Sequence, residues 1–134
     1  PCRNSLLLLT ALAHAESEFI KNKQKYNIFI GLQSEGRIPM KDTTEEFVKQ
    51  INKLSKHATK DSGYKIIAPL IKKDKDEIVF IGSKLKVPFE YTYSCFKGGF
   101  KSKRLVHCGT CINCLLRKKA FYWANIKDPT FYYK

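Results

Sequence analysis

Four of the five cysteines lie between Cys95 and Cys114, with the spacing C-x12-C-x2-C-x2-C. A disulfide framework fits this spacing poorly, because Cys111 and Cys114 lie on the opening turn of one predicted helix. A redox C-x-x-C motif would need only two cysteines. Two overlapping C-x-x-C units with one further partner match a closed tetrahedral Zn²⁺ site. An iron–sulfur cluster, which uses similar spacings, stays as the alternative.

Four thiolate ligands leave no coordination position for water or substrate, so we expect a structural zinc that holds the loop around Cys95 to the last helix. Basic residues near the thiols would lower their pKa values and favour metal binding. These residues are Lys97, Lys101, Lys103, Arg104, Lys118 and Lys119. His107 could replace a cysteine as ligand, although a histidine beside a cysteine ligand is more often its neighbour. Cys2 stands alone.

The length of 134 residues and the apolar fraction of 43% predict one domain, 1–134, with a single core. The stretch "SLLLLTALAHA" is short for a membrane span and lacks a basic leader, so it predicts a buried helix. We expect a soluble, cytoplasmic protein with no membrane partner, in a compartment where clustered thiols hold metal rather than form disulfides.

The formal net charge is +13, from 25 basic and 12 acidic residues. Clustered Lys and Arg would suit a nucleic-acid partner, because they neutralise phosphates and release counterions. The basic residues are mostly Lys and spread along the chain, with dense runs only in "KGGFKSKR" and "RKK". A solvated basic surface is therefore the favoured interpretation, and nucleic-acid binding the alternative.

Hydrophobic periodicity predicts helices alternating with short apolar strands. A buried helix over 4–20 carries the stripe Leu6, Leu9, Leu12, Ala13 and Phe19. The continuous apolar runs "YNIFIGL" and "YKIIAPL" are typical of parallel strands covered on both faces. A second helix begins at Thr43 or Thr44 as a cap. Two more helices follow, in 73–87 and 112–125. This order predicts an α/β fold with a parallel sheet.

Several segments, in order and spacing, resemble the 7-cyano-7-deazaguanine synthases of the PP-loop ATP pyrophosphatase superfamily. The most specific are "YSCFKGG", "CGTCINCLLR" and "DPTFY", while "PCRN" and "KDEIV" add support. The resemblance implies a Rossmann-like, mostly parallel sheet (adenine nucleotide alpha hydrolase-like) with a C-terminal zinc-binding knot in 95–114, and a homodimer. It also implies an ATP-dependent ligase, with ATP and Mg²⁺, that converts 7-carboxy-7-deazaguanine and ammonia to the nitrile in queuosine precursor synthesis.

The resemblance also assigns site residues. Arg3 and Asn4 match the family's R-N beside the nucleotide, Lys75 matches a phosphate-binding lysine, and Asp42 matches an aspartate near the deazaguanine. Arg117 matches the arginine of C-x-L-R, and the resemblance places it with these residues as a nucleotide- or substrate-binding residue. The family's zinc ligands correspond to four cysteines of this chain, Cys95, Cys108, Cys111 and Cys114. Taken without the resemblance, Arg3 and Lys75 are solvated cations, Asp42 is a helix cap, and Arg117 packs against an aromatic such as Tyr122.

Three departures from the family pattern qualify these assignments. The S-G-G-x-D-S loop that cradles ATP phosphates is absent from the sequence, so we expect a fragment, a separate chain or segment that supplies the loop, or lost ATP chemistry. The loop "SEGRIPMKD" carries Gly36, Met40 and Lys41 where the family has an acid, Tyr and Pro. The stretch between Cys95 and Cys108 is about four residues longer than is usual in the family. We expect this longer loop to leave the tetrahedral set of four ligands intact.

These departures leave two alternatives to the synthase activity. A diverged relative would transfer the activated deazaguanine acid to another amine, such as one on a protein. A non-catalytic, zinc-braced module would instead bind RNA or a partner subunit.

Overall fold

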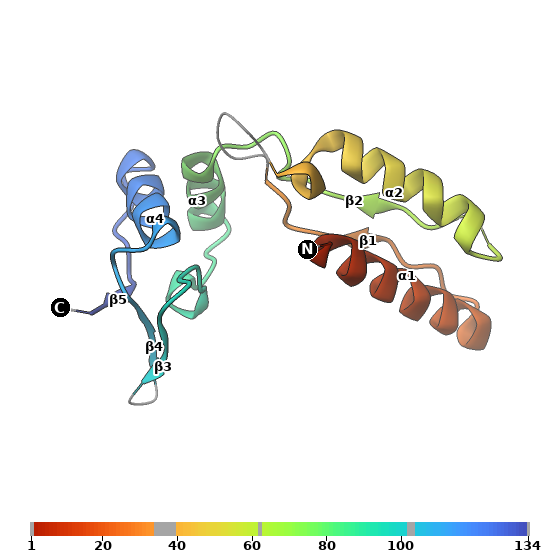
Figure 1. Cartoon of the computed structure of the whole chain (residues 1–134), viewed down its shortest axis with the longest axis horizontal. Helices are drawn as coiled ribbons and strands as arrows, with labels where there is room; N and C mark the ends of the chain where they lie inside the picture. Colours follow the sequence, from red (N-terminus) through yellow and green to blue (C-terminus); the bar gives the residue numbers. More distant parts are fainter. Residues whose placement is uncertain (1, 34–39, 62, 102–103, 134) are drawn as a thin grey trace. The chain divides into compact units, whose positions relative to one another are not determined.

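The predicted helices and apolar strands form in the predicted order, and they fall into two units, 1–73 and 74–134. This computed structural model describes residues 2–33, 40–61, 63–101 and 104–133, without the side chain of Lys101 (Figure 1). Most of the loop "SEGRIPMKD" lies outside the described residues. The expectation of a single domain over 1–134 stays a prediction, and each unit is described by itself.

The first unit begins with helix α1, Arg3–Asn22. Its buried side chains are Asn4, Leu8, Leu12 and Ala15. The predicted stripe was therefore wrong in part, because Leu6 and Leu9 are 68% and 40% exposed and Ala13 is also exposed. A leucine-rich helix presents more than one stripe with a helical period, so periodicity alone leaves open which stripe faces the core.

The two apolar runs form parallel strands, as predicted, although both are short. Strand β1, Ile28–Phe29, pairs with β2, Ile66–Ile67, with Ile28 opposite Ile66. Between them lie a short 3₁₀ helix, η1, Lys41–Thr43, and helix α2, Glu45–Ala58. Thr44 caps α2 by accepting a hydrogen bond from the Phe47 N–H at 3.1 Å.

The core of this unit lies between the two helices and the inner face of the strands. Leu8 of α1, Ile51 of α2 and Ile66 of β2 form one buried cluster, with Ile28 and Ile30 against it. A second cluster, Leu12, Ala15 and Tyr64, continues along α1. The helices and strands thus share one apolar core, as an α/β layer requires.

The second unit is built on helix α3, Lys75–Lys84, and helix α4, Ile112–Trp123. Asp74 and Glu77 form a capping box at the start of α3. Val79, Ala120 and Phe121 form the buried cluster between the helices. The Phe89 ring meets Phe121 edge-to-face at 5.0 Å between centroids, and Gly82 permits this, because a Cβ there would lie 2.7 Å from the Phe89 ring.

A small three-stranded sheet, which the sequence pattern did not predict, completes the second unit. Strands β3, Gly99–Lys101, and β4, Arg104–His107, are antiparallel. Strand β5, Phe131–Tyr132, runs parallel to β4. A 3₁₀ helix, η2, Phe89–Tyr91, leads toward the sheet. Among the helices of the described residues, none combines the length and apolarity that crossing a bilayer demands.

Candidate metal centre

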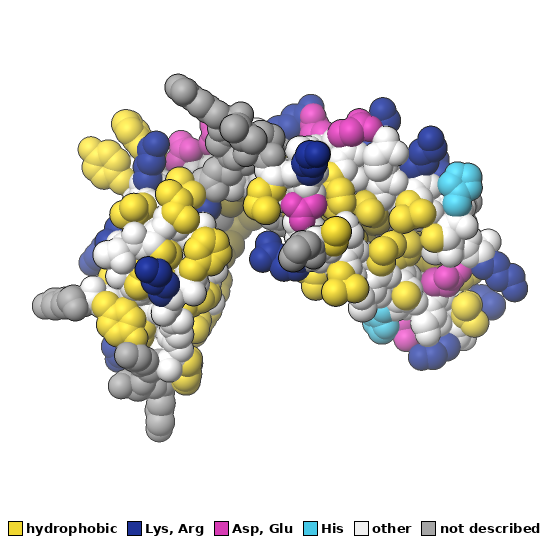
Figure 2. All heavy atoms as spheres, viewed as in Figure 1, with side chains coloured by type: hydrophobic (Ala, Val, Ile, Leu, Met, Phe, Trp, Pro, Cys, Tyr) yellow, Lys and Arg dark blue, Asp and Glu magenta, His cyan; other side chains and the backbone are white. Residues whose placement is uncertain are grey.

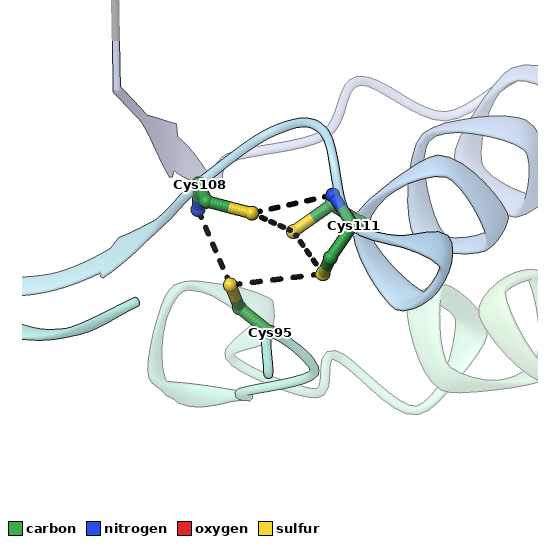
Figure 3. Close-up of side chains that lie close together, drawn as sticks. Cys95, Cys108 and Cys111 are labelled. Atoms are coloured by element: carbon green, nitrogen blue, oxygen red, sulfur yellow. Dashed lines mark hydrogen bonds between the residues drawn. The ribbon is translucent and has the colours of Figure 1, made fainter. Parts of the chain in front are cut away.

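Four cysteine sulfurs from three segments of the second unit lie together. Cys95 follows η2, and Cys108 and Cys111 lie on the turn after β4 (Figure 3). Cys114 is in the first turn of α4. All four Sγ atoms are within 4.8 Å of one another. Cysteines nearly twenty positions apart in the sequence therefore form one cluster, in agreement with the predicted ligand set.

The spacing of the sulfurs fits a tetrahedral ion. The Sγ–Sγ distance is 3.9 Å between Cys108 and Cys114 and 3.5 Å between Cys111 and Cys114. It is 3.8 Å between Cys111 and Cys95. Four thiolates about 2.3 Å from a zinc ion would be about 3.8 Å apart, so these residues fit Zn²⁺. No S–S bond joins any of them.

Backbone N–H groups point at two of the sulfurs. The Cys95 Sγ accepts hydrogen bonds from the N–H groups of Lys97, Gly98 and Cys108, at 3.3, 3.0 and 3.2 Å. Burial alone would raise the pKa of the Cys95 thiol, but these three donors together lower it. N–H groups of Thr110 and Cys111 lower the pKa of Cys108 to about 5. The turns around both cysteines therefore stabilise thiolates, the form that binds metal.

Cys114 differs from these two. It is fully buried, and burial together with the Cys111 thiol raises the pKa of Cys114 to about 12. A coordinating divalent cation deprotonates such a thiol outright. Gly109, with a φ of 75°, supplies the left-handed residue that the turn between Cys108 and Cys111 needs.

His107 is a neighbour of the cluster rather than a member of it. Its Nε2 accepts a hydrogen bond from the Ser94 N–H at 3.1 Å, and its side chain is 1% exposed. Burial and the nearby Arg117 lower the pKa of His107, so the imidazole is neutral at pH 7. The ring therefore links the segment before Cys95 to the strand before Cys108.

Only some of the basic residues named from the sequence have a described contact near the cluster. The Lys118 ammonium donates to the Gly109 carbonyl at 3.0 Å and lies 4.3 Å from the Tyr132 ring centroid. The Arg104 guanidinium lies 4.8 Å from the Phe131 ring centroid. Lys103 and the side chain of Lys101 lie outside the described residues.

Arg117 is buried within the second unit, where each of its three guanidinium nitrogens has a protein partner. It donates to the hydroxyls of Thr130 and Thr92 at 2.7 and 2.8 Å and to the Phe89 carbonyl at 3.0 Å. Its Nε lies 3.6 Å from an Asp128 carboxylate oxygen. The Arg117 guanidinium also lies 5.0 Å from the ring of Phe121, the aromatic neighbour that takes the place expected for Tyr122.

Sequence reasoning did not identify Asp128, Thr130 and Thr92 as partners of Arg117. The sequence feature that could have pointed to these partners is the "DPT" of the C-terminal segment. It served only as evidence for the family resemblance. Asp128 also accepts the Tyr132 hydroxyl at 2.6 Å and the Thr130 N–H at 3.0 Å. The network therefore fastens the C-terminal segment to α4 and to the residues after η2.

In the first unit, two of the predicted site residues meet. The Asn4 side-chain amide donates to the Asp42 carboxylate at 3.1 Å and to the Asp42 carbonyl at 3.2 Å. Asp42 lies in η1 and is not the cap of α2, a role that Thr44 fills. Arg3 is exposed at the start of α1. Lys75 opens α3 and belongs to the second unit.

The position of Asn4 and Asp42 relative to the strands is informative. Only five residues separate the end of α1 at Asn22 from the start of β1 at Ile28, and Figure 1 shows the chain turning back between them, so α1 runs antiparallel to β1. The start of α1 therefore lies at the carboxyl end of β1. In open α/β sheets this end of the strands is where ligands bind.

Comparison with known proteins agrees with this architecture. The sequence model of the family described as "Queuosine biosynthesis protein QueC" matches residues 1–125. A 7-cyano-7-deazaguanine synthase of Methanothrix thermoacetophila is 37% identical over 133 residues, 98% of this chain and 55% of the relative. A synthase of the same name from Methanothermobacter thermautotrophicus is 40% identical over 105 residues, covering 78% of this chain and 45% of the relative.

The chain therefore spans about half the length of the curated relatives it matches. The match runs through α1, both parallel strands and all four cysteines of the cluster. The chain belongs to the queuosine biosynthesis protein QueC family.

Proposed function

We propose that this chain takes part in the ATP-dependent conversion of 7-carboxy-7-deazaguanine and ammonia to 7-cyano-7-deazaguanine. The observation that carries the proposal is the similarity to relatives named 7-cyano-7-deazaguanine synthase along 98% of the chain. The four-cysteine cluster supports it, because a cluster suited to zinc is what the resemblance predicted for this segment.

The chemistry explains why ATP is required. A carboxylate is a poor electrophile, so a phosphoryl-containing group from ATP must convert one carboxylate oxygen into a leaving group. Ammonia then displaces that group and forms an amide. A second activation, at the amide oxygen, removes this oxygen and leaves the nitrile. Each activation requires donors that stabilise developing negative charge and a pocket that excludes water.

Residues of the chain take separate roles in this proposal. Asn4 and Asp42, at the carboxyl end of β1, contact the nucleotide or the deazaguanine, and the exposed Arg3 beside them attracts phosphate. Lys75 meets phosphate at the start of α3. Zn²⁺ bound by Cys95, Cys108, Cys111 and Cys114 supplies structural cross-linking only, because the thiolates fill its coordination.

The proposal gives Arg117 a positioning role in place of the substrate contact expected from the sequence. Each of its guanidinium nitrogens already has a partner within the protein, and a substrate anion would compete with these partners. Arg117 instead holds the C-terminal segment against α4, next to the metal centre.

A phosphate-cradling loop is also required, and the proposal assigns it to a polypeptide segment outside this chain's 134 residues, within a homodimeric assembly with Mg²⁺. The test combines the chain with the unmatched part of the Methanothrix relative, ATP, Mg²⁺, 7-carboxy-7-deazaguanine and an ammonium salt. Mass spectrometry should detect the nitrile and its amide precursor. ATP cleavage without either product would favour transfer to another amine, and no cleavage by a formed complex would refute the proposal.

A further inference from the structure

The three-stranded sheet of the second unit has one covered face. His107 of β4 and Tyr132 of β5 lie opposite one another, and their ring centroids are 5.8 Å apart. The Tyr93 ring also contacts His107, at 4.6 Å between centroids. These side chains mark the covered face, because His107 is 1% exposed. Side chains alternate along a strand, so the neighbours of His107 and Tyr132 in the sequence point to the other face.

That other face carries exposed aromatic rings. Phe131 and Tyr133, on either side of Tyr132, are 52% and 41% exposed. Phe131 lies opposite Val106, and Arg104 is two residues before Val106 on β4. The Arg104 guanidinium lies 4.8 Å from the Phe131 ring centroid, as expected for side chains on one face. We name the face with Arg104, Phe131 and Tyr133 the aromatic sheet face.

The aromatic sheet face is also open at its third strand. Gly99 of β3 lies opposite Val106 and therefore belongs to this face. A Cβ at Gly99 would meet no atom of the described residues within 4 Å beyond its neighbours in the chain. Figure 2 shows hydrophobic and basic side chains at the surface of this unit, in the region where Figure 1 draws α4 and the strands. Exposed apolar surface that is grouped in this way marks an interaction site.

The charge of the surrounding sequence favours a polyanion as the partner. From Tyr91 to Lys127 the chain has eight Lys and Arg residues and no Asp or Glu. Asp128, the next acid, is 15% exposed and pairs with Arg117. An apolar protein partner would explain the exposed rings but not this charge of one sign. A nucleic acid explains both, because its phosphates attract cations and its bases stack on aromatic rings.

The spacing of the rings favours a single strand over a duplex. The Tyr133 N–H donates to the His107 carbonyl at 2.8 Å, so the extended backbone of β5 continues to Tyr133. Phe131 and Tyr133 are therefore about 6.7 Å apart along the strand. Bases in a duplex follow one another at about 3.4 Å, so neighbouring bases must separate to reach both rings. A single strand allows this separation, whereas a duplex opposes it.

We propose that the aromatic sheet face binds single-stranded nucleic acid, with bases stacked on Phe131 and Tyr133. Arg104 adds donors for a phosphate and a planar guanidinium on which a base can also stack. Such stacking tolerates many sequences, because every base has a π-face. The binding requires neither ATP nor deazaguanine, so it is a function separate from the proposed synthase reaction.

Fluorescence anisotropy of the zinc-loaded chain tests the proposal. The probes are fluorescein-labelled strands of roughly 12 nucleotides, one of uridine and one of thymidine, together with an RNA duplex of the same length. We expect the single strands to bind at least tenfold more tightly than the duplex. Equal affinity for the two single strands would support contacts to bases and phosphates alone, and tighter binding of uridine would identify RNA as the partner.

Two substitutions separate stacking from charge. Phe131→Leu keeps an apolar side chain but removes the planar ring, and it should weaken binding about tenfold. Arg104→Gln should reduce the slope of log affinity against log salt by about 0.7, the value for one phosphate contact with a single strand. Zinc content and circular dichroism should match those of the unsubstituted chain in both variants.

Phe80→Leu is the matched control. Phe80 lies on α3, outside the sheet, and is 50% exposed against 52% for Phe131. It also has a cation over its ring, the Lys84 ammonium at 5.2 Å from the centroid. This substitution should change the affinity for the single strands less than twofold. Equal effects of Phe80→Leu and Phe131→Leu would overturn the proposal.

Further outcomes would also refute it. Binding of the duplex as tight as that of the single strands would reduce the interaction to charge alone. A dimer that Phe131→Leu separates, with unchanged affinity for the single strands, would assign the face to a second copy of the chain. If Phe131→Leu does not fold, Tyr133 provides the test: Tyr133→Phe should retain binding and Tyr133→Leu should lose it. Equal affinities of these two variants would exclude stacking.

Discussion

The two units carry similar net charge but differ in how their charges and cores are organised. In the first unit, exposed lysines pair with carboxylates, as in Lys25–Asp61 at 3.0 Å and Lys72–Glu45 at 3.1 Å. In the second, no acidic residue lies between Glu90 and Asp128, a stretch with eight Lys and Arg residues. Among the described residues from Glu90 to Asp128, the only ion pair joins Arg117 to Asp128, and their side chains are 7% and 15% exposed.

The difference extends to what stabilises each unit. The first relies on aliphatic side chains packed between helices and strands, and within its described residues β1 and β2 pair only with each other. The second has a smaller apolar cluster and adds the four-cysteine site and the Arg117 network. The comparison teaches that the second unit supplements a small apolar cluster with polar contacts and a candidate metal site, whereas the first relies on apolar packing.

Loss of the metal site should have the largest effect. Cys114→Ser removes a fully buried ligand, so we expect bound zinc to fall from about one ion per chain to almost none and the second unit to unfold. Zinc binding contributes about 10 kcal/mol or more to folding in small zinc domains. Elemental analysis and amide exchange measure the two effects. Cys2→Ser, at an exposed cysteine outside the cluster, is the control and should retain both zinc and protection.

Breaking the Arg117 network should come next. Arg117→Met leaves the Asp128 carboxylate buried without its cation, and we expect a loss of about 3–5 kcal/mol in the free energy of unfolding. Urea denaturation of the zinc-loaded chain measures it. Lys119→Met, at an exposed position of the same helix, should change stability by less than about 0.5 kcal/mol. Unchanged stability in Arg117→Met, with turnover abolished, would restore the substrate contact expected from the sequence.

The core of the first unit provides a contrasting pair on one helix. Leu8→Ala should destabilise that unit by about 2–5 kcal/mol, because Leu8 is 2% exposed and fills the cluster with Ile51 and Ile66. Leu6→Ala, at a residue 68% exposed, should cost less than about 0.5 kcal/mol. Denaturation followed by amide exchange in 47–67 distinguishes the units. Equal costs would mean that the stripe predicted from the sequence is the buried one after all.

The smallest expected effect concerns the cap of α2. Thr44→Ala removes the acceptor of the Phe47 N–H and should cost about 1 kcal/mol. Thr43→Ser keeps the hydroxyl that Thr43 donates to the Met40 carbonyl, and it should be nearly neutral. Thermal unfolding by circular dichroism is sensitive enough for both. A larger loss in Thr43→Ser than in Thr44→Ala would move the cap to the other candidate position.

Local patterns predicted much of this architecture. The four helices, the two parallel strands and the cysteine ligand set follow from periodicity and spacing, since each is encoded by residues close in sequence. The sheet β3–β4–β5 did not follow, because β5 pairs with β4 across more than twenty intervening residues and has only two residues of its own. The partners of Arg117 were missed for the same reason.

By itself, the sequence determined the order of the helices and the two parallel strands, the choice of Cys95, Cys108, Cys111 and Cys114 as candidate metal ligands, and the family. Only the tertiary structure decided which face of α1 is buried, that Asn4 meets Asp42, and that the Asn52 side chain of α2 pairs with the backbone of Ile66 in β2. The physical reason is that spacing and composition act over a few neighbouring residues. Burial and hydrogen-bond pairing, in contrast, depend on which distant segments come into contact.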